Sequence, residues 1–114
     1  MDRFLAALNA LDEARISACF TDDVTVFVPS LQAGRVSGKP AVNRIFHDYV
    51  EAMRRTTSHA SIVPEDLRIE MADRLALVSF TVHSAGSTAR RSFIFRSVNG
   101  TWLISHFHAS NLRQ

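Results

Sequence analysis

The 114-residue sequence has few residues that form disulfides or break secondary structure: one cysteine, three prolines and four glycines. A single cysteine cannot form an internal disulfide and excludes a cysteine-rich metal site. Cys19 follows Ile16 at helical spacing, which favours a buried, inert thiol. The glycines form no phosphate-binding loop. No apolar run is long enough to cross a bilayer and the first residues lack a signal-peptide layout, so we expect a cytoplasmic protein without membrane contact.

The sequence also lacks an excess of charge of one sign. The chain has 13 basic and 11 acidic residues, which gives a net charge of +2. The arginine pairs at 54–55 and 90–91 stand apart from one another, and no basic stretch is interleaved with aromatic residues. This distribution argues against a nucleic-acid-binding surface. With 46% hydrophobic residues, the chain is long enough to bury a core as one domain over residues 1–114.

The first half of the chain is patterned for helices. Phe4, Leu5, Leu8 and Leu11 lie on one helical stripe and predict a short first helix. Asp12 is a candidate N-cap for a second short helix that runs to about residue 20. Pro40 suits the first turn of a third helix, where its missing N–H is harmless. The apolar stripe of that helix comprises Val42, Ile45, Phe46, Tyr49, Val50 and Met53.

Strand patterns surround and follow this third helix. Residues 24–28 predict a strand that ends at Pro29, and Val36 marks a short extended piece. From residue 59 the apolar period becomes two, with strands expected around 67–71 and over 74–83, 90–98 and 101–111. Pro64 predicts an edge position or a bulge, and Asn99-Gly100 predicts a tight hairpin with positive φ angles. Three helices packed into one curved, mostly antiparallel sheet define an α+β fold.

The last strand carries apolar or aromatic side chains in both alternating sets. Strict alternation places Trp102, Ile104, His106 and His108 on one face, and Leu103, Ser105, Phe107 and Ala109 on the other. Neither set is typical of a solvent-facing surface. We therefore expect both faces of this strand to be covered.

Three segments together resemble the nuclear transport factor 2-like superfamily, in its SnoaL-like and calmodulin-dependent-kinase association-domain branches. They are Phe20-Thr21-Asp22-Asp23-Val24-Thr25-Val26, Gly38-Lys39-Pro40-Ala41-Val42 and the last three predicted strands, over residues 73–82 and 91–111. The resemblance implies a cone with an internal pocket, and homodimers that pair through the convex sheet. It places Trp102, Ile104, His106 and His108 at the expected dimer interface.

The sequence departs from the resembled families at their functional positions. Val28 stands before Pro29, where steroid-isomerase-like members carry a catalytic carboxylate, so no proton-abstracting carboxylate carries over. Val82, Phe93 and Ala109 match positions at which the kinase association domains carry carboxylate-binding arginines. We therefore expect an apolar pocket that prefers neutral hydrophobic ligands to small carboxylates.

His59 matches a pocket histidine of the kinase association domains and is the candidate catalytic residue. An imidazole can act as acid, base or donor near neutral pH; the alternative is a partly exposed histidine in a loop. Tyr49 lies on the apolar stripe of the third helix, either with its hydroxyl in the cavity or as a satisfied core tyrosine. The predicted pocket comprises Val28, Tyr49, His59, Val78, Phe80, Val82, Phe93, Phe95 and Phe107.

His106 and His108 have a spacing that could chelate a transition metal, with His83 as a possible third ligand. Two ligands on one strand are insufficient, and the resemblance favours hydrogen-bonded histidines at a subunit interface. We expect neither a metal nor an organic cofactor.

Two functions fit these observations. The first is a protein that binds a small hydrophobic molecule, with cofactor-free isomerase, cyclase or dehydratase chemistry as its catalytic form. The second is a non-catalytic homo-oligomerisation or binding module whose cone is filled by its own core. Fold alone does not choose between them.

Overall fold

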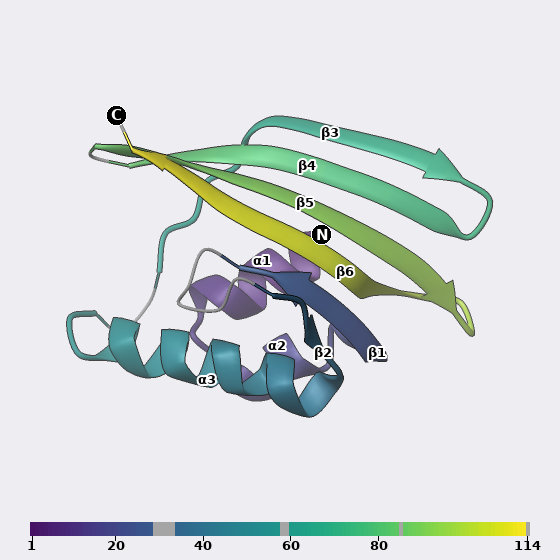
Figure 1. Cartoon of the computed structure of the whole chain (residues 1–114), viewed down its shortest axis with the longest axis horizontal. Coiled ribbons are helices and arrows are strands. Elements are labelled where there is room, and N and C mark those ends of the chain that lie inside the picture. Colours follow the sequence, from purple (N-terminus) through teal and green to yellow (C-terminus); the bar gives the residue numbers. More distant parts are fainter. Residues whose placement is uncertain (29–33, 58–59, 85, 114) are drawn as a thin grey trace.

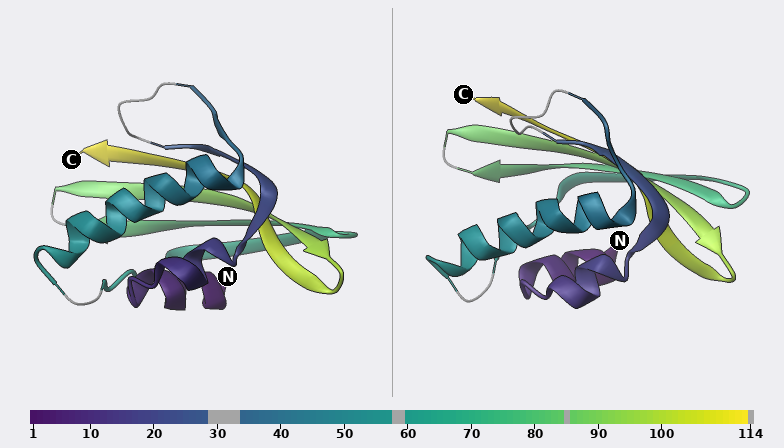
Figure 2. Two further views of the ribbon diagram at one scale, coloured as in Figure 1. Left: turned by 90° about the horizontal axis from the view of Figure 1, so that it is seen from below. Right: turned by 60° about the horizontal axis from the view of Figure 1, so that its bottom comes forward.

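The computed structural model describes residues 1–28, 34–57, 60–84 and 86–113. Three helices lie against one face of a curved, open sheet, as Figures 1 and 2 show. The elements are α1 (Asp2–Asn9), α2 (Glu13–Ser17), β1 (Phe20–Phe27), β2 (Val36–Ser37), α3 (Lys39–Arg54), β3 (Glu65–Ala72), β4 (Leu75–Ser84), β5 (Ser87–Val98) and β6 (Thr101–Arg113). The strand order is β2-β1-β6-β5-β4-β3, with β1 and β6 parallel and the other pairs antiparallel. The α+β prediction is confirmed.

The helices begin where the sequence predicts. The Asp12 carboxylate caps α2 by accepting a hydrogen bond from the Arg15 N–H at 3.2 Å. Gly38 precedes α3 with a φ of +91°, and Pro40 occupies its first turn. Val42 and Val50 of α3 are fully buried, so the apolar stripe of this helix faces the sheet.

The hairpin between β5 and β6 also forms as predicted. Asn99 and Gly100 have φ angles of +52° and +83°, and Val98 pairs with Thr101 directly across the turn. Positive φ at both central residues gives the turn a twist that matches the twist of the flanking strands. This turn fixes the register of the two longest strands.

The beginning of β1 differs from the prediction. The polar run Thr21-Asp22-Asp23 was expected to precede the strand, yet β1 starts at Phe20. Phe20 lies opposite Ile104 and Thr25 lies opposite His106, so residues 21–24 face only Ser105 of β6. This irregularity accommodates the polar residues within the strand, because an extra length of chain is bulged out of the ladder.

The alternation expected for β6 is broken by a second bulge. Ile94 lies opposite His106, but Phe95 lies opposite Ile104, which leaves Ser105 without a ladder partner. Residues directly opposite each other share a face of the sheet. Ile104 and Trp102 therefore lie on the concave face, whereas His106 lies on the convex face. The prediction that these residues and His108 share one face is wrong.

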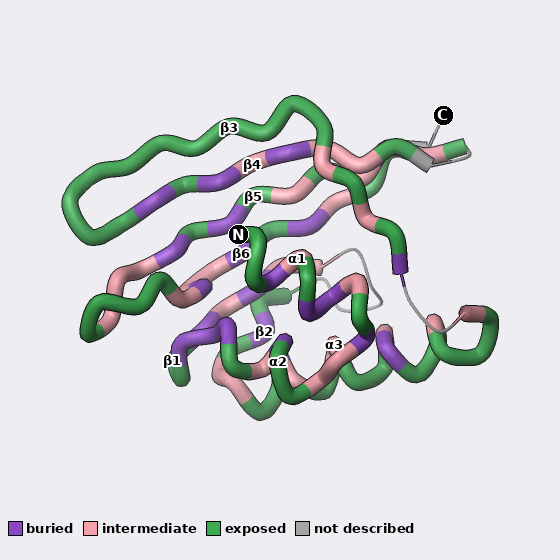
Figure 3. Tube along the Cα trace, turned by 180° about the vertical axis from the view of Figure 1, so that it is seen from behind, coloured by how far each residue is buried: buried purple, intermediate pink, exposed green. Residues whose placement is uncertain are grey.

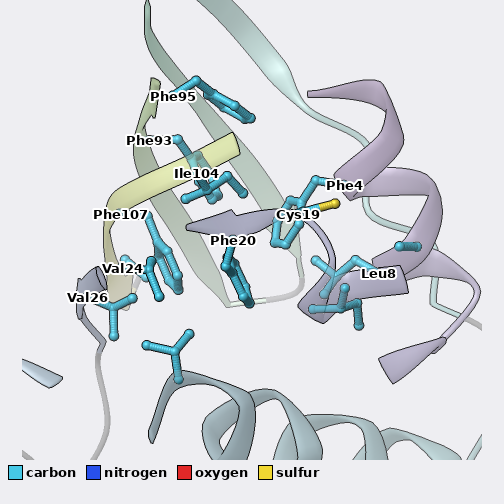
Figure 4. Close-up of a cluster of buried hydrophobic side chains, with 14 of the residues drawn as sticks. Phe4, Leu8, Cys19, Phe20, Val24, Val26, Phe93, Phe95, Ile104 and Phe107 are labelled. Atoms are coloured by element: carbon cyan, nitrogen blue, oxygen red, sulfur yellow. The ribbon is translucent and has the colours of Figure 1, made fainter. Parts of the chain in front are cut away.

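The core fills the space between the concave face and the helices. Phe93 lies near its centre, with its ring centroid 5.3 Å from that of Phe107 and 5.5 Å from that of Phe4. Figure 4 shows these rings and Phe20 converging from β5, β6, α1 and β1. Aromatic contacts of this kind add about 0.5–1.5 kcal/mol per pair beyond the area that they bury.

Strand β3 lies at the free edge of the sheet, beyond the cover of the helices. Every one of its residues is exposed, whereas buried and exposed residues alternate along β4 and β5 (Figure 3). The register of β3 against β4 shifts between Glu65 and Arg68. The edge position and the irregularity predicted from Pro64 are both confirmed. Among the described helices, none combines the length and apolarity that crossing a bilayer requires.

Candidate ligand cavity

A cavity of about 300 Å³ opens between α3 and the concave face formed by β4, β5 and β6. Helix α3 supplies one wall because its apolar stripe faces the sheet, and the inward residues of three strands supply the other. Its lining residues are Leu8, Val28, Ile45, Phe46, Tyr49, Ile62, Val82, Arg91, Phe107 and Ala109. All but Tyr49 and Arg91 are hydrophobic.

The predicted pocket residues fall into three groups. Val28, Tyr49, Val82 and Phe107 lie on the cavity wall. The others on the strands are packed in the core, where each is at most 5% exposed: Val78, Phe80, Phe93 and Phe95. His59 lies outside the described residues. Core side chains, most of them aromatic, therefore fill the centre of the concave face, and this cavity lies to one side of them.

Arg91 is the wall residue that the sequence analysis missed. It lies opposite Phe80 of β4 and Ala109 of β6, so its side chain starts from the concave face. It is half-buried, and this burial lowers the pKa of its guanidinium from the ordinary value. The signal was present in the sequence, because Arg91 alternates with the inward residues Phe93 and Phe95 of the same strand. The expectation of an uncharged lining is wrong.

The guanidinium of Arg91 is held by neutral acceptors. Its Nη1 donates to the backbone oxygens of Arg90 at 2.9 Å and Ser110 at 3.1 Å, and to Oδ1 of Asn111 at 3.2 Å. The bonds to Ser110 and Asn111 join the first half of β5 to the end of β6. Within the described part of the chain, no carboxylate forms an ion pair with Arg91.

Tyr49 is the other polar group on the wall. Burial is the larger influence on its phenol and raises its pKa above the ordinary value, while the charge of Arg91 acts in the opposite direction. At neutral pH the phenol is therefore protonated and can donate a hydrogen bond. Tyr49 and Arg91 together give an apolar cavity two hydrogen-bond donors, one of them cationic.

The paired histidines of β6 lie away from this cavity. Nδ1 of His106 is 2.7 Å from Oγ1 of Thr25, and the Phe27 ring lies beside both imidazoles. Burial and the nearby charge of Arg35 lower the pKa of His106, which favours its neutral form. His108 is exposed.

The third histidine proposed as a metal ligand has other neighbours. Nε2 of His83 is 3.1 Å from Glu65, and its Nδ1 is 3.1 Å from Thr88. In the described residues, the ligand atoms near enough to share an ion belong to a different set, Glu13, His47 and Glu51, and lie within 4.8 Å of one another.

A second cavity, of about 400 Å³, lies at the opposite end of β6, and Trp102 is part of its wall. It is lined by Met1, Arg3, Phe4, Cys19, Phe95, Gly100, Thr101 and Trp102. Arg3 donates from Nη2 to the Trp102 carbonyl at 3.4 Å, which closes part of its rim. Cys19 is buried there, as predicted from its spacing.

Comparison with known proteins identifies the family. The whole chain, residues 1–114, matches the family model described as a SnoaL-like domain, so this protein belongs to the SnoaL-like domain family. No curated protein matches the sequence.

Solved structures of nuclear transport factor 2-like (NTF2-like) proteins share the fold. A proposed dehydratase of the NTF2-like family from Streptomyces avermitilis is 18% identical, with a TM-score of 0.81 over 99% of this chain and 91% of that one. A proposed ketosteroid isomerase from Parabacteroides distasonis is 16% identical, with a TM-score of 0.77 over 97% and 83%. A proposed calcium/calmodulin-dependent protein kinase II association domain from Xanthomonas campestris is 17% identical, with a TM-score of 0.69 over 97% and 81%. The resemblance drawn from the sequence is confirmed.

Proposed function

We propose that this protein binds a small molecule with a compact apolar body in the cavity between α3 and strands β4–β6. The observation that carries the proposal is the wall itself, which is hydrophobic apart from Tyr49 and Arg91. Transfer of apolar surface from water into such a wall is favourable by about 25 cal/mol per Å². Ligand pockets typically measure about 300–1,000 Å³, so this cavity suits a ligand at the small end of that range.

A catalytic form of this function would be cofactor-free isomerase, cyclase or dehydratase chemistry. The proposed dehydratase and ketosteroid isomerase among the structural neighbours support these reaction types. Such reactions need a group that exchanges a proton near neutral pH. Tyr49 stays protonated there, and Val28 occupies the position where the resemblance would place a carboxylate. We therefore assign the acid–base role in any turnover to His59, and expect His59→Gln to abolish turnover while ligand binding persists.

The binding proposal can be tested by filling the cavity. Val82 lies on the wall, and Thr81 is its neighbour on the opposite face of β4. Val82→Trp should remove the stabilisation that a bound apolar compound confers in a thermal-shift screen, because ligands that bind only the folded state raise the melting temperature. Thr81→Trp adds the same ring outside the cavity and should leave the shift unchanged. Equal shifts in both variants would place the binding elsewhere.

A second candidate function, homodimerisation, is favoured by the convex face of the sheet. Leu75, Leu77 and Ile94 are hydrophobic and are 49%, 42% and 36% exposed. Leu77 and Ile94 lie opposite each other in the β4–β5 ladder, next to His106. Contiguous exposed apolar side chains on a sheet commonly mark an interaction surface. We propose that two copies of the chain pair through this surface, which leaves the cavity on the concave side free for ligand.

A further inference from the structure

The cavity wall contains a cation that its immediate neighbours do not neutralise. Arg91 projects from β5 into a wall that is otherwise apolar except for Tyr49. A guanidinium carries five N–H donors, and the bonds formed with described residues all come from Nη1. Their acceptors are two carbonyl oxygens and an amide oxygen, none of which carries a formal charge.

Burying a charge away from water is costly unless an opposite charge or hydrogen bonds replace the lost hydration. Arg91 is half-buried, so water still reaches part of its guanidinium and the neutral acceptors replace part of the remaining hydration, while the described carboxylates form no ion pair with it. An anion that entered the cavity would supply the missing counter-charge. Planar carboxylates suit this role because they match the fork of a guanidinium.

Tyr49 adds a second donor from the opposite wall. Its phenol belongs to α3, it lines the same cavity, and it is near enough for the charge of Arg91 to act on it. The phenol remains protonated at neutral pH because burial opposes its ionisation. A neutral donor and a cationic donor can therefore face one ligand group from both sides of the cavity.

We propose that the natural ligand is an organic monoanion, whose carboxylate accepts hydrogen bonds from Arg91 and the Tyr49 hydroxyl and whose compact apolar body packs against Val82, Phe107 and the apolar residues of α3. This inference builds on the proposed ligand-binding function and specifies the chemical class of the ligand. It replaces the preference for neutral ligands expected from the sequence. Arg91 lies opposite Ala109 on the neighbouring strand. Ala109 itself matches a position at which the kinase association domains carry an arginine.

The test compares carboxylic acids with alcohols that have a similar hydrocarbon part. The probes are benzoate and benzyl alcohol, cyclohexylacetate and cyclohexylethanol, and octanoate and octanol, titrated by calorimetry and thermal shift at neutral pH. We expect the best acid to bind the unchanged protein about tenfold or more tightly than its alcohol, because hydrogen bonds to charged groups contribute more than neutral ones. This readout requires no variant and is independent of any effect of mutation on folding.

Variants then assign the preference to Arg91. Arg91→Met keeps the length and the apolar stem of the side chain, and it should remove the preference for the acid while the alcohol binds as before. Arg91→Lys keeps the positive charge but loses the planar pair of donors, and it should retain part of the preference for the acid. Arg90→Met is the matched control, because Arg90 is the exposed neighbour on the opposite face of β5 and its loss changes the net charge equally.

The possible outcomes separate this inference from the proposed function. If acids and alcohols bind equally, or if Arg90→Met lowers acid affinity as much as Arg91→Met, the monoanion inference is wrong and the apolar binding site stands. If neither series binds and Val82→Trp changes nothing, the proposed function fails and the inference fails with it. A preference for acids that Arg91→Met abolishes and Arg90→Met preserves supports both.

Discussion

Ile104 lies directly opposite Phe95 across the β5–β6 ladder, and both side chains face the helices. Ile104 has no exposed surface, and its N–H donates to the Cys19 carbonyl at 2.7 Å. A side chain in this position contributes to the stability of the single chain. It is not available to a partner subunit, so the predicted dimer interface loses Ile104.

Shortening this side chain should destabilise the protein itself. We expect Ile104→Ala to lower the free energy of unfolding by about 2–5 kcal/mol, because the lost methyl groups leave a cavity that the surroundings only partly fill. The measurement is urea denaturation at a concentration where the chain is monomeric. Leu67→Ala is the control, since Leu67 is 47% exposed on the edge strand β3. A larger loss for Leu67→Ala than for Ile104→Ala would contradict this placement.

The same pair of residues shows where sequence patterns stop being informative. Alternation along residues 101–111 correctly placed Phe107 and Ala109 on one face, because the ladder is regular there. The bulge at Ser105 shifts the phase by one residue, and a one-residue shift moves every side chain beyond it to the other face. Nothing in the local sequence predicts the bulge, which depends on how β1 and β5 pair with β6.

The turns and caps were predictable for the opposite reason. Asp12 and Asn99-Gly100 act through bonds and backbone angles within a few residues of themselves, so local chemistry determines them. The cavity was predictable only in part. Four of its wall residues were predicted from the sequence. Arg91 was not, because an arginine pair in a sequence is usually solvent-exposed, and only the pairing of β5 with β4 and β6 shows that Arg91 shares the inward face of Phe93.

The hairpin turn offers a test of backbone strain alone. Gly100 has a φ of +83°, and a Cβ added there would meet no atom within 4 Å. Gly100→Ala should therefore destabilise the protein by about 1–2 kcal/mol, through the cost of a left-handed conformation for a residue with a Cβ. Thermal and urea unfolding measure the loss. Asn99→Gly is the matched control and should cost much less, because glycine adopts the φ of +52° at that position without strain.

A surface histidine provides a pH-dependent prediction. Nδ1 of His47 lies 2.7 Å from Oε1 of Glu13, and this hydrogen bond, reinforced by the charge of Glu13, raises the pKa of His47 above 6.5. The protonated form is favoured in the folded state. The pair therefore stabilises the fold fully below the unfolded pKa of about 6.5, and this contribution is lost as the pH rises through the folded pKa.

Titration of the His47 ring by NMR measures this shift directly. Glu13→Gln should move the pKa of His47 back toward its ordinary value, because it removes both the charge-assisted hydrogen bond and the adjacent charge. Glu51→Gln should move it less, since Glu51 acts on His47 only through its charge and to a smaller extent. A greater effect of Glu51→Gln would show that α3, rather than the contact between α2 and α3, controls this histidine.

The proposed homodimer leads to a prediction for the convex face. Leu77 is 42% exposed in the single chain and lies opposite Ile94 at the centre of the exposed apolar group. If two such faces pair, Leu77→Asp would bury an unpaired carboxylate at the interface, which is strongly destabilising. We expect the unchanged protein to sediment as a dimer and Leu77→Asp as a folded monomer.

Ile69→Asp is the matched control, because Ile69 is 55% exposed on the other face of the sheet, opposite Val78. Dissociation by Ile69→Asp but not by Leu77→Asp would place the interface on the free edge around β3, and a monomeric unchanged protein would exclude the dimer altogether.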